Sequence, residues 1–156
     1  MTANNYSSLL KYISMMKRDT NRYFQLKLKK FNLGGGQQFF HLRIAENPGI
    51  SMYDLARTGA FDKATVTKAV NKLLAEGYIT QETDAKDRRL KRLKTTDKAK
   101  EVIDYVYEIR DKWISQMMDN FSEEEAMTIY KGLEKMAEHT GAAICKMNEE
   151  EKKGEQ

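Results

Sequence analysis

DKATVTKAVNKLLAEGYI occupies residues 62–79, and its apolar side chains recur at the spacing of an amphipathic helix. Asp62 suits the N-cap, because its carboxylate can accept a backbone N–H from the first turn, and Gly77 suits the C-terminal stop. One face of the helical wheel carries Val66, Ala69, Val70, Leu73 and Leu74. The opposite face carries Ala64, Thr65, Lys68, Asn71 and Lys72, with no acidic residue. A helix that is apolar on one side and polar to basic on the other favours insertion into the major groove of DNA.

A shorter helix precedes this one. SMYD, residues 51–54, has the pattern of a capping box, with Ser51 as the cap and Asp54 at the third helical position. Leu55 and Ala56 continue the helix, and residues 58–60 supply a tight turn that contains glycine. Two short helices joined in this way predict a helix-turn-helix.

A basic run, DAKDRRLKRLK, occupies residues 84–94 and holds six Lys or Arg residues and two aspartates. Its excess of four positive charges equals the net charge of the whole 156-residue chain, +4, so the remainder is neutral on balance. Ile79–Thr83 and Arg89–Thr95 have the composition of strands, with a turn at residues 84–88 between them. The sequence therefore predicts a β-hairpin directly after the helix-turn-helix, which makes a wing that can reach a second groove.

Each polar residue of the predicted recognition helix has a length that suits one kind of contact. Thr65 and Asn71 can reach base edges, whereas Lys68 and Lys72 can reach phosphate or guanine acceptors. The alternative for this face alone is an ordinary solvated, lysine-rich surface. The basic hairpin that follows favours DNA binding.

Two aspartates within the basic run require a physical role. Asp87 can order the turn and orient an adjacent guanidinium, and Asp84 can bind nearby backbone amides in an Asx-turn. We expect these two acids to support the wing. The wing residues expected to bind DNA are Lys86, Arg88, Arg89 and Lys91.

Long amphipathic helices flank this lobe. Helices are predicted over residues 6–31 and 37–46, from Asp97 onward, and from the capping box of Ser122 and Glu125 onward. Their apolar stripes exceed what one small lobe can cover, so they predict a homodimer. The expected organisation is a DNA-binding lobe at 34–96, a helical dimerisation region at 1–33 and 97–147, and a disordered tail at 148–156.

Several classes of protein are disfavoured. A single cysteine, Cys145, excludes an intrachain disulfide framework, and its helical position predicts a buried, inert thiol. His41 and His139 have no ligand-type neighbours at metal-binding spacing, so no metal site is expected. No nucleophile motif or phosphate-binding loop is present, so neither an enzyme nor a cofactor is expected. No apolar segment has the length of a membrane span, and we expect a cytoplasmic protein without membrane contact.

DKATVTKAVNKLLAEGYI followed by DAKDRRLKRLKTTDKAKE resembles the recognition helix and wing of the MarR/SlyA transcriptional regulators. The family's wing pattern is D-x-R-D-x-R, and here Asp84, Lys86, Asp87 and Arg89 stand at its four positions, so Lys86 replaces the first arginine. Thr95 also stands where the family usually has leucine. The specific motifs span about residues 51–101, whereas the order of elements agrees over roughly residues 6–147.

The resemblance implies a function and roles for single residues. Arg89 would enter the minor groove with Asp87 as its support, and Lys68 would contact a base or a phosphate. The family implies a homodimeric repressor that binds pseudo-palindromic double-stranded DNA. It also implies a small aromatic or anionic effector, which the methionines and tyrosines of the chain could accommodate. The alternative reading is a winged-helix protein-interaction module that binds an acidic partner through its basic wing.

Overall fold

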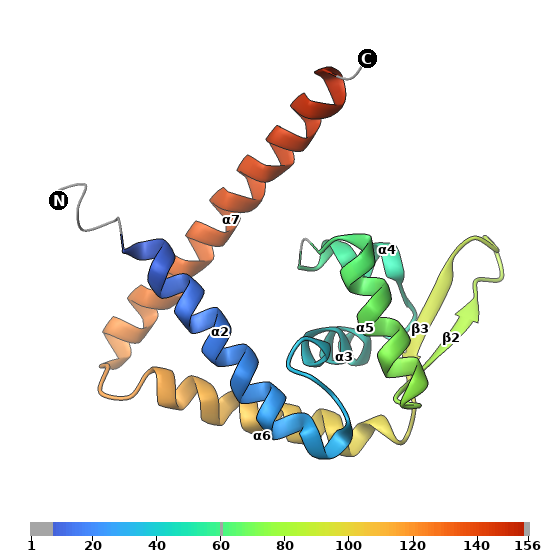
Figure 1. The fold of residues 1–156 in the computed structure, drawn as a ribbon, viewed down its shortest axis with the longest axis horizontal. Coiled ribbons are helices and arrows are strands. Elements are labelled where there is room, and N and C mark those ends of the chain that lie inside the picture. Colours follow the sequence, from blue (N-terminus) through green and yellow to red (C-terminus); the bar gives the residue numbers. More distant parts are fainter. Residues whose placement is uncertain (1–7, 60, 155–156) are drawn as a thin grey trace. The chain divides into compact units, whose positions relative to one another are not determined.

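The computed structural model of the chain describes residues 8–59 and 61–154, and Figure 1 shows its path. The described residues form two compact units, of which the first ends at Trp113 and the second begins at Ile114. The predicted fold class is confirmed, because the chain is mainly α-helical with one small antiparallel sheet. The first unit contains the predicted helix-turn-helix and wing.

Two long helices frame the first unit. Helix α2 (Leu9–Leu28) continues into a single 3₁₀ turn, η1 (Lys29–Phe31), and α6 (Ala99–Met117) packs beside it. The Tyr23 hydroxyl donates to the Ile109 carbonyl at 3.1 Å, and the Tyr23 ring stacks on Trp113 with centroids 4.5 Å apart. The predicted start of the first helix, at Tyr6, lies outside the described residues.

The rest of the first unit is the winged lobe. Its elements are α3 (Gln37–Glu46), β1 (Ile50–Ser51), α4 (Met52–Arg57), α5 (Lys63–Ala75), β2 (Ile79–Thr83) and β3 (Lys91–Thr95). Helices α4 and α5 are the two helices of the predicted helix-turn-helix, and β2 and β3 form the wing (Figure 1). The bounds of α3 and β2 agree with the sequence prediction.

The sheet differs from the predicted two-stranded hairpin in two respects. A third strand, β1, pairs antiparallel with β3 through Ile50 and Leu93, which gives the strand order β1-β3-β2. A strand of two residues is too short to show alternation in the sequence. Strand β3 also begins at Lys91 instead of Arg89, because hydrogen bonds between Asp84 and Leu90 and between Leu90 and Asp87 keep residues 84–90 in the turn.

Local capping fixes the ends of α4 and α5 as predicted. The Ser51 hydroxyl accepts the Asp54 backbone N–H at 3.0 Å, and the Asp62 carboxylate accepts that of Thr65 at 2.8 Å. Helix α5 ends at Ala75, and Gly77, just beyond its C-cap Glu76, has a φ of 72°, in the left-handed region that favours glycine. The first strand of the wing therefore follows the end of α5 directly in the sequence.

The beginning of α6 departs from the prediction. The helix that the sequence predicts from Asp97 onward begins at Ala99 instead. The carbonyls of Thr96 and Asp97 accept the backbone N–H groups of Ala99 and Lys100, which makes a turn before the helix. The Thr96 hydroxyl donates to the Gly77 carbonyl at 2.8 Å, so residue 96 is used to join the wing to the end of α5.

One apolar core unites the lobe with α2 and α6. Its fully buried members come from every helix of the first unit and from β3, and the largest are Phe40, Leu28, Ile44, Leu55, Leu73 and Leu93. His41 is buried among them with no exposed surface. The outer face of α5 is thus carried on a core that also includes the long helices.

The second unit contains α7 (Glu123–Gly154), a helix of 32 residues. Its predicted capping box is present, since the Ser122 N–H donates to Glu125 at 2.8 Å and the Ser122 hydroxyl accepts the Glu125 N–H at 3.3 Å. The helix extends through most of the segment 148–156 that was expected to be disordered, while residues 155–156 lie outside the described part. Glutamate and lysine form helix well without apolar neighbours, and Lys146 lies 3.9 Å from Glu150 one turn away.

Across residues 8–59 and 61–154, no helix combines the length and the apolar character needed to cross a membrane.

Candidate nucleic-acid interface

The outer face of α5 presents most of the residues that the sequence selects for DNA contact. Lys68 and Asn71 are exposed, and Thr65 is exposed at the first turn with its hydroxyl donating to Asp62 at 2.7 Å. Lys72 lies differently, because its ammonium is 2.7 Å from the Glu76 carboxylate and its side chain is half-buried. That carboxylate neutralises Lys72, whereas Lys68 and Asn71 are exposed.

Two neighbours on this face escaped the sequence reading. Lys63 and Thr67 line one open hollow together with Ala64, Lys68 and Asn71. The spacing of residues 63, 67 and 71 is one helical turn each, so the i, i+4 rule could have found them. The hollow on the outer face of α5 therefore begins at Lys63, one residue before the first residue of the predicted face.

Asp84 organises the turn of the wing. Its carboxylate accepts the backbone N–H of Lys86 at 2.8 Å and that of Asp87 at 2.9 Å, which is the Asx-turn expected at this position. Backbone hydrogen bonds from Asp87, then the side chain of Arg92, then the amide of Lys86 lower the pKa of Asp84 to about 2. The carboxylate is charged at neutral pH and holds the turn in one shape.

Asp87 holds Arg89 in a two-point contact. The Nε and Nη2 atoms of Arg89 donate to the two carboxylate oxygens of Asp87, each at 3.0 Å, and the Arg89 backbone N–H donates to the same carboxylate. The hydrogen bonds from Arg89 lower the pKa of Asp87. A bidentate pair fixes the plane of the guanidinium, and the Arg89 side chain is nevertheless 89% exposed. Arg89 is thus oriented and accessible at once.

Arg92 is a wing residue that the sequence reading missed. Its Nε donates to the Asp84 carboxylate at 2.7 Å, and its Nη1 donates to the Gly49 carbonyl at 3.3 Å. The Gly49 N–H in turn donates to the Leu93 carbonyl at 2.8 Å. Arg92 therefore ties the turn of the wing to the loop before β1. Helical and strand periodicity carries no signal for this contact, because the two partners are 43 residues apart.

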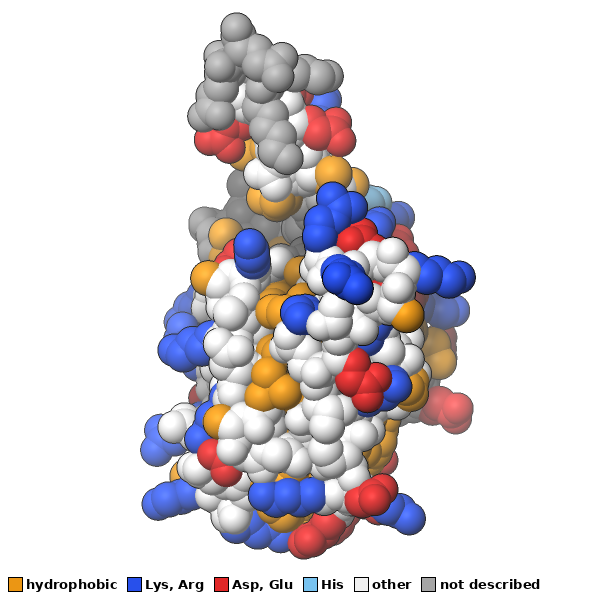
Figure 2. All heavy atoms as spheres, turned by 90° about the vertical axis from the view of Figure 1, so that its right-hand side faces the viewer, with side chains coloured by type: hydrophobic (Ala, Val, Ile, Leu, Met, Phe, Trp, Pro, Cys, Tyr) orange, Lys and Arg blue, Asp and Glu red, His pale blue; other side chains and the backbone are white. Residues whose placement is uncertain are grey.

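Ion pairs within the hairpin engage three of the six cations of the basic run: Arg92 with Asp84, Lys94 with Glu82, and Arg89 with Asp87. The four wing residues that the sequence selects, Lys86, Arg88, Arg89 and Lys91, are all exposed. Figure 2 shows the face of the molecule that lies on the right in Figure 1, where Lys and Arg side chains are spread among small, separate apolar patches and some acidic side chains.

The two histidines and the single cysteine are the remaining side chains that the sequence analysis considers for a metal site or a thiol function. The described residues include no group of three or more His, Cys, Asp or Glu side chains that could hold a metal ion. Burial lowers the pKa of His41 to about 4, and neither ring nitrogen has a hydrogen-bond partner among the described residues. Cys145 is exposed in the single chain, so the expectation of a buried thiol is wrong at this level. Cys145 lies on the outer surface of α7, and the sequence alone does not show whether a helix surface faces solvent or a protein core.

Comparison with known proteins gives one consistent family. The MarR family profile matches residues 42–90, which cover the helix-turn-helix and the turn of the wing. The chain is 30% identical over 128 residues to the HTH-type transcriptional regulator BilQ of Clostridioides difficile (strain CD3), covering 82% of this chain and 86% of that protein.

Solved structures that resemble this chain belong to the same family. A MarR protein from Peptoclostridium difficile DA00132 superposes with a TM-score of 0.88 at 35% identity, covering 94% of this chain and 96% of the other. A MarR transcriptional regulator from Methanosarcina mazei Go1 superposes with a TM-score of 0.81 at 30% identity, covering 88% and 99%. Fold, motifs and relatives agree that the chain belongs to the MarR family of winged helix-turn-helix proteins, whose members are transcriptional regulators and not enzymes.

Proposed function

We propose that the chain is a sequence-specific repressor that binds pseudo-palindromic double-stranded DNA as a homodimer. The observation that carries the proposal is the wing: Arg89 is held by Asp87 in a bidentate contact and still exposes most of its side chain. An oriented guanidinium suits the narrow minor groove, where the negative potential of DNA is concentrated. A cluster that served only to attract anions would not need this orientation.

The outer face of α5 supplies the second half of the interface. In a winged helix-turn-helix, the second helix enters the major groove while the wing reaches beyond it. Lys68 and Asn71 are exposed at the middle of this face, and we assign them to base edges or the adjacent phosphates. Thr65, Lys86, Arg88 and Lys91 are assigned to the flanking backbone, and Lys72 is a weaker candidate because Glu76 pairs with it.

Exposed apolar side chains support the homodimer. In α7, Tyr130, Leu133, Ile144 and Met147 are between 44% and 61% exposed and recur at helical spacing. No residue is buried in the single chain between positions 123 and 151. Helix α2, considered separately, exposes Leu10, Tyr12 and Leu26. Large apolar side chains left exposed in this number on long helices are typical of a protein–protein interface. We therefore assign residues 1–33 and 97–147 to dimerisation and residues 34–96 to DNA binding.

Repression, effector control and a cytoplasmic site of action complete the proposal. A dimer that covers two half-sites blocks other proteins from the same DNA, so occupancy by itself is sufficient to repress. A protein that works on chromosomal DNA in a prokaryote works in the cytoplasm, and its relatives are transcriptional regulators. An effector would act by binding the DNA-free form more tightly than the DNA-bound form.

The test begins with selection of an operator from a random pool of duplexes. The affinity of the chain is then measured for that operator, for a random duplex and for a polyacidic peptide, each at several salt concentrations. We expect a pseudo-palindromic operator, preference for it over random DNA, and a steep fall in affinity with salt. Equal affinity for the peptide and the operator would instead identify a module that binds acidic partners.

Sedimentation tests the dimer independently. We expect a dimer at micromolar concentration, and Leu133→Glu should yield monomers because it places a charge within the exposed apolar stripe of α7. Lys131→Glu, which introduces the same side chain at an exposed polar position of that helix, should remain dimeric. A stable wild-type monomer that binds the operator with full affinity would contradict the dimer.

A further inference from the structure

The C-terminal end of α5 is connected to the end of the first long helix by side-chain hydrogen bonds. Asn32, the residue directly after η1, donates from its side-chain amide to the Glu76 carboxylate at 2.6 Å. The Tyr78 hydroxyl donates to the Phe31 carbonyl at 3.0 Å. Residues 31 and 32, which follow α2, are thereby joined to the residues that follow α5.

The start of α6 contacts the same end of α5. The Lys98 ammonium donates to the Glu76 carbonyl at 2.7 Å and lies 4.9 Å from the centre of the Tyr78 ring. The Thr96 hydroxyl donates to the Gly77 carbonyl, and the Thr96 backbone N–H donates to the Tyr78 carbonyl at 3.0 Å. We call this hydrogen-bonded cluster the joint, and it comprises residues 31–32, 76–78 and 96–98.

Two of these contacts are stronger than an ordinary surface hydrogen bond. Tyr78 is buried, with 5% of its surface exposed, so its hydroxyl depends on the Phe31 carbonyl as a partner. The hydrogen bond from Lys72 lowers the pKa of Glu76, and the hydrogen bond from Asn32 lowers it further. The carboxylate is therefore charged at neutral pH, and a charged acceptor strengthens the bond from Asn32.

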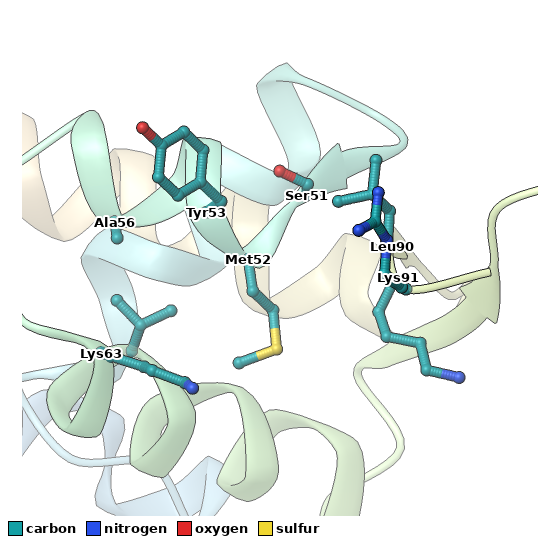
Figure 3. Close-up of a pocket in the computed structure, with 9 residues that line it drawn as sticks. Ser51, Met52, Tyr53, Ala56, Lys63, Leu90 and Lys91 are labelled. Carbon is teal, nitrogen blue, oxygen red and sulfur yellow. The ribbon is translucent and has the colours of Figure 1, made fainter. Parts of the chain in front are cut away.

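Away from the joint, α5 packs mainly against α3 and α4 of its own lobe. Its N-terminal half borders a cavity of about 410 Å³ that lies between α5, α4 and the wing. Figure 3 shows the Met52 side chain extending into this space, with Lys63 on one side and Leu90 and Lys91 on the other. Contacts with the wing therefore do not fix the direction of α5 at this end.

Helix α5 also shares the apolar core with α2 and α6. Burial of apolar surface is not directional, whereas a hydrogen bond constrains both distance and angle. The joint therefore supplies directional contacts between α5 and the two long helices.

We propose that the joint fixes the direction of α5 relative to α2 and α6, and that Asn32 and Tyr78 are the positioning residues that restrict the half-site spacing the homodimer accepts. The inference rests on the proposed function, because spacing matters only if the long helices hold two copies together and α5 of each copy enters DNA. Both side chains are uncharged, and neither is among the residues assigned to DNA contact. Their role is therefore indirect.

Two half-sites bound by one dimer have to match the distance and the angle between its two α5 helices. In helix-turn-helix dimers, the half-sites lie about one helical turn apart, roughly 34–36 Å. One inserted base pair moves the second half-site by about 3.4 Å and turns it by about 34° around the DNA axis. If the joint is rigid, the DNA has to be distorted to restore the match, which lowers the affinity. If the joint is loosened, α5 can follow the half-site instead.

Asn32→Gly and Tyr78→Phe together remove the two side-chain bonds between the ends of α2 and α5 and leave the charge of the chain unchanged. Glycine adopts the left-handed conformation of Asn32, whose φ is 56°, and phenylalanine keeps the ring of Tyr78. The matched control is Asn47→Gly. Asn47 also caps the C-terminus of a helix, but its side-chain amide donates to Arg43 within α3, at 3.0 Å.

The affinity of the full chain is measured for the selected operator, for duplexes with one base pair inserted or removed between the half-sites, and for a duplex with a single half-site. We expect wild type and Asn47→Gly to lose about ten-fold or more in affinity when the spacing is altered. The double variant should lose about three-fold or less and should bind the single half-site as wild type does. Asn32→Gly alone, at an exposed position, should show an intermediate loss, which keeps the proposal testable if the double variant does not fold.

The outcomes separate the joint from the proposed function. If wild type depends on the spacing and both the double variant and Asn32→Gly depend on it equally, the joint does not set the spacing, while the proposed function stands. If Asn47→Gly accepts altered spacing as readily as the double variant, general loosening of the lobe explains the effect, and the inference is refuted. If the double variant loses the same factor on the single half-site as on the operator, the joint acts on the DNA-contacting surface and not on spacing. If wild type has no operator with two half-sites, the proposed function and the role of the joint are both wrong.

Discussion

The buried imidazole of His41 should make the free energy of unfolding depend on pH. Burial lowers its folded-state pKa from 6.5 to about 4, and neither ring nitrogen has a hydrogen-bond partner among the described residues. The unfolded chain therefore binds more protons between these two values. The stability that the folded chain gains from holding His41 neutral is fully present above pH 6.5 and is lost as the pH falls toward 4. Over the whole interval between the two pKa values, the loss in the free energy of unfolding is about 3 kcal/mol.

The assay is urea unfolding at a fixed protein concentration, from pH 8 to pH 4.5, because dimerisation makes stability depend on concentration. His41→Leu replaces the imidazole with an apolar side chain and should flatten the profile below pH 6.5. It should cost little at pH 8, since the imidazole nitrogens that it removes are unpaired. His139→Gln, at an exposed position of α7, is the matched control and should keep the wild-type slope. Parallel profiles for wild type and His41→Leu would refute the reasoning.

Three further predictions concern the DNA interface. Lys68→Ala should lower operator affinity about ten-fold per half-site and reduce the preference for operator over random DNA; an equal loss on both duplexes would limit Lys68 to phosphate contact. Asp87→Ala and Arg89→Ala should each lose operator affinity, and the double variant should lose little more than either, as measured in a double-mutant cycle; additive losses would mean that Asp87 does not position Arg89. Arg92→Gln should lose operator affinity and protection of the wing amides from hydrogen exchange, whereas Lys94→Gln, which removes the same charge from an exposed position, should keep both; identical behaviour of the two would show that only charge matters.

Contacts between near neighbours in sequence could be predicted, and contacts between distant segments could not. In the caps at Ser51 and Asp62 and in the turn at Asp84, a side chain accepts a backbone N–H from two or three residues away, so these features follow from the local pattern. Arg92 reaches Gly49 only after the helix-turn-helix has folded between them. Strand β1 likewise exists only as a partner for β3.

The same limit explains the differences at the site. The helical wheel places Lys72 on the outer face of α5, but it does not show that Glu76 takes its charge one turn away. The cavity beside Met52 is formed by three segments, and no one of them carries a recognisable signal. The list of DNA-contacting residues stays a prediction, and the ion pairs among those residues became visible only in the folded chain.

The Asx-turn of the wing uses residue 86 through its backbone alone. Asp84 and Arg92, by contrast, depend on each other's side chains, with 2.7 Å between donor and acceptor. Among relatives, substitutions at positions 84 and 92 should therefore occur together, while position 86 should change independently of both. A different side chain at position 86 would therefore alter the surface of the wing without altering the shape of its turn.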